Sequence, residues 1–236
     1  MTTAEQRRGF LKAGLLGGAA AAAPLGAAVA APATAPATAP AAAPSAPAGW
    51  QFFRPSEAEF AEHLADHMVP ADDLSPSGTA LGIPVYIDRA LAGAWGQGER
   101  LYLQGPFAPG TPNQGYQLPL TPAQLFRAGF ESLDDALRRR HGRAFAQLDA
   151  AAKEAVLQAL QAGQLPLAVP TATWWAHTYQ LVMEGLFADP VHGGNRDKAG
   201  WRLVGFPGVV QTHRRNIVAF RGKPFPHQPL GIADLA

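Results

Sequence analysis

The stretch TATWWAHTYQLVMEGL, residues 171–186, dominates the fold expected of this chain. Thr171 or Thr173 offers the start of a helix. Apolar side chains would cover most of the circumference of that helix, and they are Trp174, Trp175, Tyr179, Leu181, Val182, Met183 and Leu186. A helix that is apolar nearly all round is normally buried, so we predict this one to be the central helix of the core.

Five more helices are predicted from helical spacing and capping signals. The first begins with Ser56 as its cap and Glu59 as the partner in a capping box, and it ends before Pro70. The others are expected over residues 84–91, 121–142, 149–163 and 196–203.

The connecting segments are long and rich in helix breakers. Residues 105–120 contain four prolines and three glycines, which excludes a helix, and their Phe107 and Tyr116 indicate that the loop is held against a surface. The tail, residues 210–236, is irregular apart from a strand candidate at 217–220. We therefore predict residues 50–236 to be a single, compact, mainly α domain with long ordered loops.

The first 49 residues differ in composition from the rest. Residues 1–30 resemble a twin-arginine signal peptide, because Arg7 and Arg8 precede an Ala/Gly/Leu stretch that ends in the small-x-small site at 28–30. Residues 31–49, rich in Ala and Pro, are expected to be a disordered linker. The prediction is a protein exported to the periplasm by the twin-arginine route, with an uncleaved membrane anchor as the alternative.

Composition excludes several classes of protein. The 236 residues include no cysteine, so the chain has no Cys-ligated zinc or iron–sulfur cluster, no Cys-x-x-Cys-His haem attachment and no thiol nucleophile. Residues 50–236 carry 16 basic and 17 acidic side chains. This near-neutral balance argues against capture of nucleic acid or of an anionic membrane by net charge.

One pair of histidines has the spacing of metal ligands. His63 and His67 lie one helical turn apart with Asp66 between them, a pattern that can place two imidazoles on one ion. No third ligand is identifiable, and His67 lies beside Phe60 on the helical wheel. The favoured interpretation is a border residue of the core without a metal, and a stand-alone periplasmic metalloenzyme is kept as an alternative.

The segment from 185 to 201 holds the densest group of turn and polar residues. Gly193 and Gly194 permit backbone conformations that other residues avoid, and Asn195 can cap the helix that follows. Four polar residues form a candidate ligand site, which would make the chain a periplasmic binding module: Asp189, His192, Arg196 and Asp197. Because no nucleophile or metal set accompanies them, a rigid corner that presents Trp201 and Phe206 is the favoured interpretation.

These residues also carry a family resemblance. The run Phe-Ala-Asp-Pro-x-x-Gly-Gly-Asn-Arg-Asp at 187–197, Ala-Gly-Trp at 199–201 and Gly-Phe-Pro-Gly at 205–208 resemble the third, small subunit of membrane-bound gluconate 2-dehydrogenase and of related flavin-dependent sugar dehydrogenases. The resemblance covers about residues 50–210, and other matching runs lie at 52–53, 69–73, 87–89, 102–107 and 115–118.

The resemblance implies a role within a complex. In such complexes a large subunit of the glucose–methanol–choline type holds FAD and oxidises the sugar or sugar acid, and a cytochrome subunit with c-type haems passes electrons to the quinone pool. The small subunit carries the export signal. We therefore expect a non-catalytic escort and stabiliser of the large subunit, which meets the membrane only through the complex and binds no nucleic acid.

No catalytic or cofactor-binding residue is then expected in this chain. The residues expected at the interface with the large subunit are Phe107, Tyr116, Asp189, Gly193, Gly194, Asn195, Arg196, Trp201 and Phe206, with Phe225 from the tail. For the aromatic residues among them, closure of the chain's own core is the alternative role.

Overall fold

The computed structural model describes residues 49–108, 110–210 and 212–235. The expected signal peptide and nearly all of the expected linker lie outside these residues. The described residues contain seven α-helices and no named strand, which confirms the prediction of a mainly α domain. The helices are α2 (Pro55–Met68), α3 (Ile83–Ala92), α4 (Pro122–His141), α5 (Ala150–Gln161), α6 (Thr171–Phe187), α7 (Ala199–Val204) and α8 (Arg214–Ala219).

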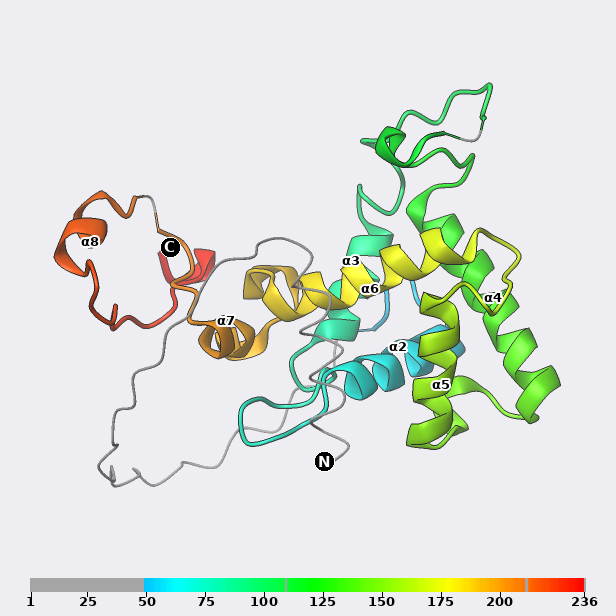
Figure 1. Ribbon diagram of the computed structural model, residues 1–236, viewed down its shortest axis with the longest axis horizontal. Helices are drawn as coiled ribbons and strands as arrows, with labels where there is room; N and C mark the ends of the chain where they lie inside the picture. Colours follow the sequence, from blue (N-terminus) through cyan, green and yellow to red (C-terminus); the bar gives the residue numbers. More distant parts are fainter. Residues whose placement is uncertain (1–48, 109, 211, 236) are drawn as a thin grey trace. The chain divides into compact units, whose positions relative to one another are not determined.

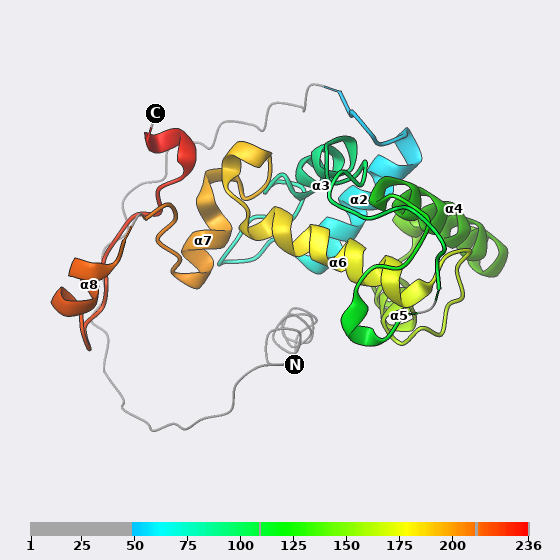
Figure 2. The same cartoon turned by 90° about the horizontal axis from the view of Figure 1, so that it is seen from above.

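Helix α6 is the central helix, as its sequence predicted. It packs against α3, α4, α5 and α7, and Figure 2 shows it running between them (yellow). Its Trp174 is 1% exposed, and the indole Nε1 donates a hydrogen bond to the Phe126 carbonyl of α4 at 3.0 Å. A Cβ on Gly129 would lie 2.1 Å from the Trp174 ring, so this glycine allows α4 to approach α6 closely.

Helices α4 and α5 begin and end where their sequence signals predicted. The Thr121 hydroxyl accepts a hydrogen bond from the Gln124 N–H, and the Gln124 side chain accepts one from the Thr121 N–H, which completes a capping box. Asp149 caps α5 through the N–H of Ala152. Both helices pack against α6, and Figure 1 shows them near its N-terminal half.

The start of α2 differs from the prediction. Ser56 is not the cap. Arg54 occupies the N-cap position, and its N–H donates to the carboxylate of Glu57, whereas Glu59 takes no part in the box. The reason lies in tertiary structure, because Glu57 is 1% exposed and pairs with Arg127 of α4 at 2.9 Å. A helix that began at Ser56 would not place this carboxylate at the third helical position.

The segment before α2 is fixed to α3 by one buried carboxylate. Asp88 is 3% exposed and accepts hydrogen bonds from three consecutive backbone N–H groups, those of Gln51, Phe52 and Phe53, each at 2.9 Å. The Phe53 ring is buried beside Phe126 of α4. Asp88 therefore determines where the described domain begins to pack.

The strand candidate at residues 217–220 is wrong. These residues belong to α8 and the turn after it, with Ile217 N–H bonded to the His213 carbonyl and Phe220 N–H to that of Asn216. A strand needs a neighbour for its backbone groups, and the described residues offer a single isolated bridge, between Gly208 and Leu230. Local i to i+4 bonding satisfies the backbone instead.

No helix in the described part of the chain is long and apolar enough to cross a membrane. Within the loop 105–120, the described residues form no α-helix, only the short 3₁₀ turn η1 (Pro112–Gln114). The helical domain is the frame on which the motif at 187–201 is built.

Candidate functional site: the corner after helix α6

The residues that carry the family resemblance form a tight corner, residues 188–201, after the end of α6. Asp189 caps the 3₁₀ turn η3 (Pro190–His192) by accepting the Val191 N–H. A Cβ on Gly194 would lie 2.2 Å from the Gly185 carbonyl oxygen of α6, so only glycine fits there. The corner therefore packs directly on the backbone of the central helix.

Asn195 bonds both ends of the corner. It is fully buried and has a left-handed backbone with φ of 46°. Its amide Nδ2 donates to the Ala188 carbonyl and its Oδ1 accepts the Gly200 N–H, both at 2.8 Å. Asn195 is not the N-cap of α7 as predicted, because a 3₁₀ turn at Arg196–Lys198 intervenes and Lys198 holds the N-cap position. Its side chain instead joins the Gly200 N–H in the first turn of α7 to the Ala188 carbonyl at the end of α6.

Arg196 links the corner to the loop before α3. Its backbone N–H donates to the Leu81 carbonyl and its guanidinium to the Ala80 carbonyl, each at 3.0 Å. Arg196 is thus already bonded to backbone oxygens of its own chain, and it holds two distant parts of the domain together.

The four polar residues considered as a ligand site are not joined to one another. Among the described residues, no side-chain hydrogen bond or ion pair connects any two members of this set: Asp189, His192, Arg196 and Asp197. The carboxylate of Asp189 instead accepts the N–H groups of Val191 and Ile232. This arrangement favours the rigid corner over the ligand site.

The Trp201 side chain joins the far end of the corner to the end of α6. It is 4% exposed, its Nε1 donates to the Phe187 carbonyl at 2.6 Å, and its ring meets Phe206 edge to face at 5.3 Å. For Trp201 the structure therefore supports the core role, because a side chain buried in its own chain has no surface left for a partner. Asn195 is buried in the same way.

The residues that follow the corner expose apolar side chains. Leu203, Val204 and Phe206 follow Trp201 and are 43%, 57% and 46% exposed. We call these three residues the α7 surface. Sequence reasoning identified Phe206 but missed Leu203 and Val204, and the only local signal was an apolar pair at the end of a short helix.

The C-terminal tail is attached to the corner at two points. The Ile232 N–H donates to the Asp189 carboxylate at 2.8 Å, and Lys198 Nζ lies 2.5 Å from Asp234 Oδ2. The hydrogen bond from Lys198, followed by one from the Gly231 N–H, lowers the pKa of the Asp234 carboxyl. The tail predicted to be irregular thus has a defined attachment.

We expect Asp234→Asn to loosen the tail without unfolding the domain. A depressed pKa means that this stabilisation is present above the pKa of the unfolded chain and is lost as pH falls through the folded-state value, so at neutral pH the pair is intact. Trypsin at neutral pH should cut the variant faster than the parent after Arg214, Arg215 or Arg221, by roughly threefold, on the scale of one exposed ion pair. Equal rates of cleavage would show that the pair does not hold the tail, and Asp73→Asn, in an exposed loop, is the matched control.

The two histidines of the metal hypothesis have other partners. His67 is 7% exposed and its Nε2 lies 3.0 Å from Glu154 of α5, and His63 Nδ1 lies 3.4 Å from Lys153 Nζ. A lysine ammonium beside His63 would repel a cation. No group of three or more potential metal-ligating side chains occurs within the described ranges, so the geometry gives the metalloenzyme alternative no support.

The loop candidates divide into inward and outward residues. Tyr116 packs edge to face on His177 of α6 at 5.5 Å and donates to the Leu120 carbonyl at 2.6 Å, and burial raises the pKa of its hydroxyl. Tyr116 thus holds the loop against α6, as expected. Phe107 is 38% exposed, and the neighbouring Tyr102 is 80% exposed.

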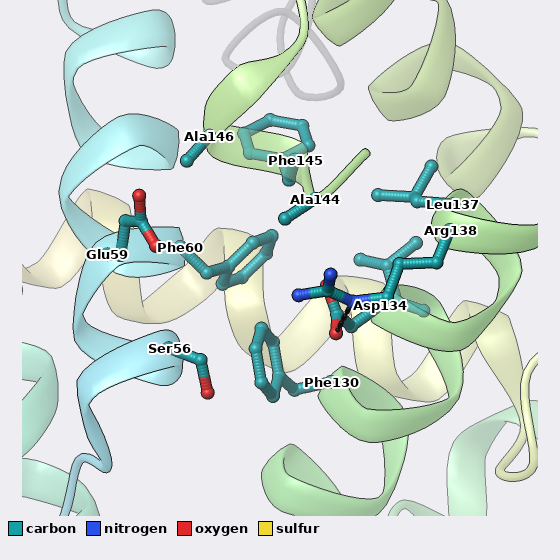
Figure 3. A pocket seen from close by; sticks show the side chains of 11 residues that line it. Ser56, Glu59, Phe60, Phe130, Asp134, Leu137, Arg138, Ala144, Phe145 and Ala146 are labelled. Carbon is teal, nitrogen blue, oxygen red and sulfur yellow. Dashed lines mark hydrogen bonds and ion pairs between the residues drawn. The ribbon is translucent and has the colours of Figure 1, made fainter. Parts of the chain in front are cut away.

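A shallow hollow between α2, α4 and the 3₁₀ turn η2 (Phe145–Gln147) lies away from the corner (Figure 3). Its floor is aromatic, since the Phe60 ring meets those of Phe130 and Phe145 at 5.2 Å each. At its rim the Arg138 guanidinium reaches Asp134 of the same helix at 2.7 Å. Its polar side chains at the rim, Ser56 and Glu59 included, form no set of converging catalytic groups.

Comparison with known proteins gives a family match over the part of the chain that contains the motif at 187–201. The family model described as gluconate 2-dehydrogenase subunit 3 matches residues 55–208, which runs from the start of α2 to just beyond the α7 surface. Neither the curated proteins nor the solved structures gave a significant match. The match covers more than half of the chain and includes the whole corner, so this chain belongs to the gluconate 2-dehydrogenase subunit 3 family.

Proposed function

We propose that this chain is the non-catalytic small subunit of a periplasmic, flavin-dependent sugar or sugar-acid dehydrogenase, and that it escorts the FAD-containing large subunit through the twin-arginine route. The observation that carries the proposal is the family match over residues 55–208. Family membership makes the chain a small subunit of a dehydrogenase complex. The escort role, the route and the partner's identity are the proposed part.

The proposed division of labour follows from what this chain lacks. The family resemblance implies c-type haems in the complex, and without cysteine this chain cannot attach one through two thioethers, so we propose that a cytochrome subunit carries them. FAD belongs to a large subunit of the glucose–methanol–choline type, where the substrate is oxidised. This chain would contact the large subunit directly and the cytochrome only through it.

We propose the α7 surface as the main docking site for the large subunit. Leu203, Val204 and Phe206 present exposed apolar side chains within four residues of each other, directly after a corner held by the hydrogen bonds of Asn195 and Trp201. Apolar and aromatic groups on a preorganised frame are what stable interfaces use, because little conformational entropy is lost on binding. Tyr102 and Phe107, on the loop before α4, are a second candidate contact.

The escort proposal predicts a joint failure of export. In a strain that co-expresses this chain with its large subunit, Arg7→Lys/Arg8→Lys should leave both proteins in the cytoplasm, since the leader would be the only address they share. Fractionation and immunoblotting of both subunits measure the outcome. The pair Arg139→Lys/Arg140→Lys, on exposed residues at the end of α4, is the matched control and should export normally.

Two results would contradict the proposal. Export of the large subunit beside the Arg7→Lys/Arg8→Lys chain would remove the escort role. A Leu203→Ser/Phe206→Ser chain that still co-purifies with the large subunit would remove the α7 surface as the docking site. Leu74→Ser, which changes a 62% exposed leucine in a loop, controls for the loss of an exposed apolar side chain.

A further inference from the structure

The tail loop, residues 209–230, is strongly basic, although residues 50–236 together are nearly neutral. It carries four basic residues and no acidic residue, which leaves twelve basic and seventeen acidic side chains in the rest of residues 50–236. The near-neutral total therefore averages a strongly positive loop and an acidic body. Net charge counts against binding to an anionic surface for the chain as a whole, but not for this loop.

The four basic side chains are available to a ligand. Arg214, Arg215, Arg221 and Lys223 are all exposed, and none of them forms an ion pair with another described residue. The acid that lies nearest in sequence, Asp234, is already paired with Lys198. The loop thus holds unneutralised positive charge.

Exposed aliphatic side chains lie among these cations. Ile217 and Val218 of α8 are 68% and 79% exposed. They stand three and four positions after Arg214, so the arginine lies between them on one face of the helix. Asn216, on the opposite face, is half-buried. An arginine in this position can keep its guanidinium at a charged surface while its stem lies along apolar groups.

The loop has a fixed shape despite its exposure. At its base Val209 N–H donates to the Leu230 carbonyl and Leu230 N–H to that of Pro207. Further out, Phe225 meets Phe220 edge to face at 4.9 Å and stacks on His227 at 4.6 Å. Phe225, considered above as an interface anchor, is therefore part of the loop's own small aromatic cluster.

We propose that the tail loop binds an anionic phospholipid surface, with Ile217 and Val218 entering the headgroup region and the four basic residues contacting lipid phosphates. Charge complementarity selects an anionic partner. The apolar part of the loop is small, because Ile217 and Val218 lie on a helix of only six residues, about 9 Å long. A specific protein interface needs about 800 Å² on each side, which this helix does not offer. A bilayer requires no shape complementarity and accepts a few aliphatic side chains flanked by cations.

The family match ends at residue 208 and the tail loop begins at 209, so this proposal does not rest on the family match. It does not rest on the proposed escort function. Binding to lipid needs no large subunit, so the two proposals fail in different experiments.

The test is flotation of the full chain with two kinds of vesicle, phosphatidylcholine alone and equal parts of phosphatidylcholine and phosphatidylglycerol. The parent should bind the anionic vesicles and bind them less as salt is raised. Arg214→Gln/Arg215→Gln and, separately, Ile217→Ser/Val218→Ser should each weaken binding by about tenfold. All variants carry the same leader, so a difference between them reports on the tail loop.

The matched controls are Arg139→Gln/Arg140→Gln for charge and Leu74→Ser for apolar exposure, and both should bind like the parent. Because the changed residues are exposed, thermal unfolding should be the same for every protein. Equal binding to both kinds of vesicle, or variants that bind like the parent, would overturn the proposal. So would tail-loop variants that keep lipid binding but no longer co-purify with the large subunit, which would assign the loop to a protein partner.

Discussion

Replacing Asp88 with alanine is expected to lower the free energy of unfolding of this domain by about 4 kcal/mol. The buried carboxylate accepts three backbone N–H groups, from Gln51, Phe52 and Phe53. A hydrogen bond to a charged group contributes about 1.5–3 kcal/mol, and a buried donor left without a partner adds a desolvation penalty. Urea unfolding followed by circular dichroism measures the change, and the midpoint of thermal unfolding should fall by roughly 10 °C.

Asp88→Asn separates charge from shape. The amide keeps one oxygen, which can serve Phe52 and Phe53 at the position of Oδ1, but its NH₂ group then faces the Gln51 N–H. We expect about half of the alanine effect. Asp73→Ala, in an exposed loop, is the control and should change stability by less than about 0.5 kcal/mol. An alanine variant as stable as this control would show that the carboxylate does not hold the segment 51–53.

The contrast between Asp88 and α6 shows what sequence can predict. Helix α6 was predicted because its apolar residues recur at helical spacing within one segment, and α4 because Thr121, Pro122 and Gly142 mark its ends. Asp88 lies in one of the runs that carry the family resemblance, but its role gave no local signal, because its three partners lie 35 to 37 positions earlier in the chain. Contacts between distant segments leave no periodic pattern.

The errors have the same origin. At the start of α2 the sequence predicts Ser56 with Glu59, but Glu57 pairs with Arg127, 70 positions away, and the helix begins with Arg54 at the N-cap. At 217–220 the β-branched residues Ile217 and Val218 favour a strand locally, but no neighbouring strand exists among the described residues. In both places the local sequence preference is real, but the tertiary structure decides against it.

For the candidate site, the sequence predicted the residues better than their roles. The sequence predicts a corner built on Gly194 and Asn195, and the structure has a tightly packed corner there, but it also predicts Trp201 as an interface candidate, and Trp201 is buried. The side chains that are exposed, Leu203 and Val204, look from sequence like ordinary core residues of a short helix. Whether an apolar side chain faces its own core depends on the elements packed around it, which composition does not show.

The second large effect is expected for Gly194→Ala, because the corner depends on close backbone approach. The added Cβ would lie 2.2 Å from the Gly185 carbonyl oxygen, which also accepts the Asn195 N–H at 2.8 Å. The oxygen cannot move away without loss of that bond. We expect a loss of about 3 kcal/mol in the free energy of unfolding, measured by urea unfolding.

A matched glycine shows whether the effect is steric. Gly163 has a left-handed backbone with φ of 67°, and an added Cβ there would have no neighbouring atom within 4 Å. Gly163→Ala should therefore cost only about 1 kcal/mol, the penalty that a Cβ brings to a left-handed backbone. If both variants lost the same amount, the close approach of the corner to α6 would not be important for stability.

The same variant distinguishes a structural corner from a ligand site. If the corner serves to hold the α7 surface, Gly194→Ala should weaken co-purification of the large subunit together with stability, because Leu203, Val204 and Phe206 lose their rigid support. The pair His192→Gln/Asp197→Asn, which keeps polar side chains of similar size but removes the imidazole and the carboxylate, should then leave both properties unchanged. A ligand site predicts the opposite order, with function lost in the polar variant while stability is kept, and that result would restore the binding module as the better interpretation.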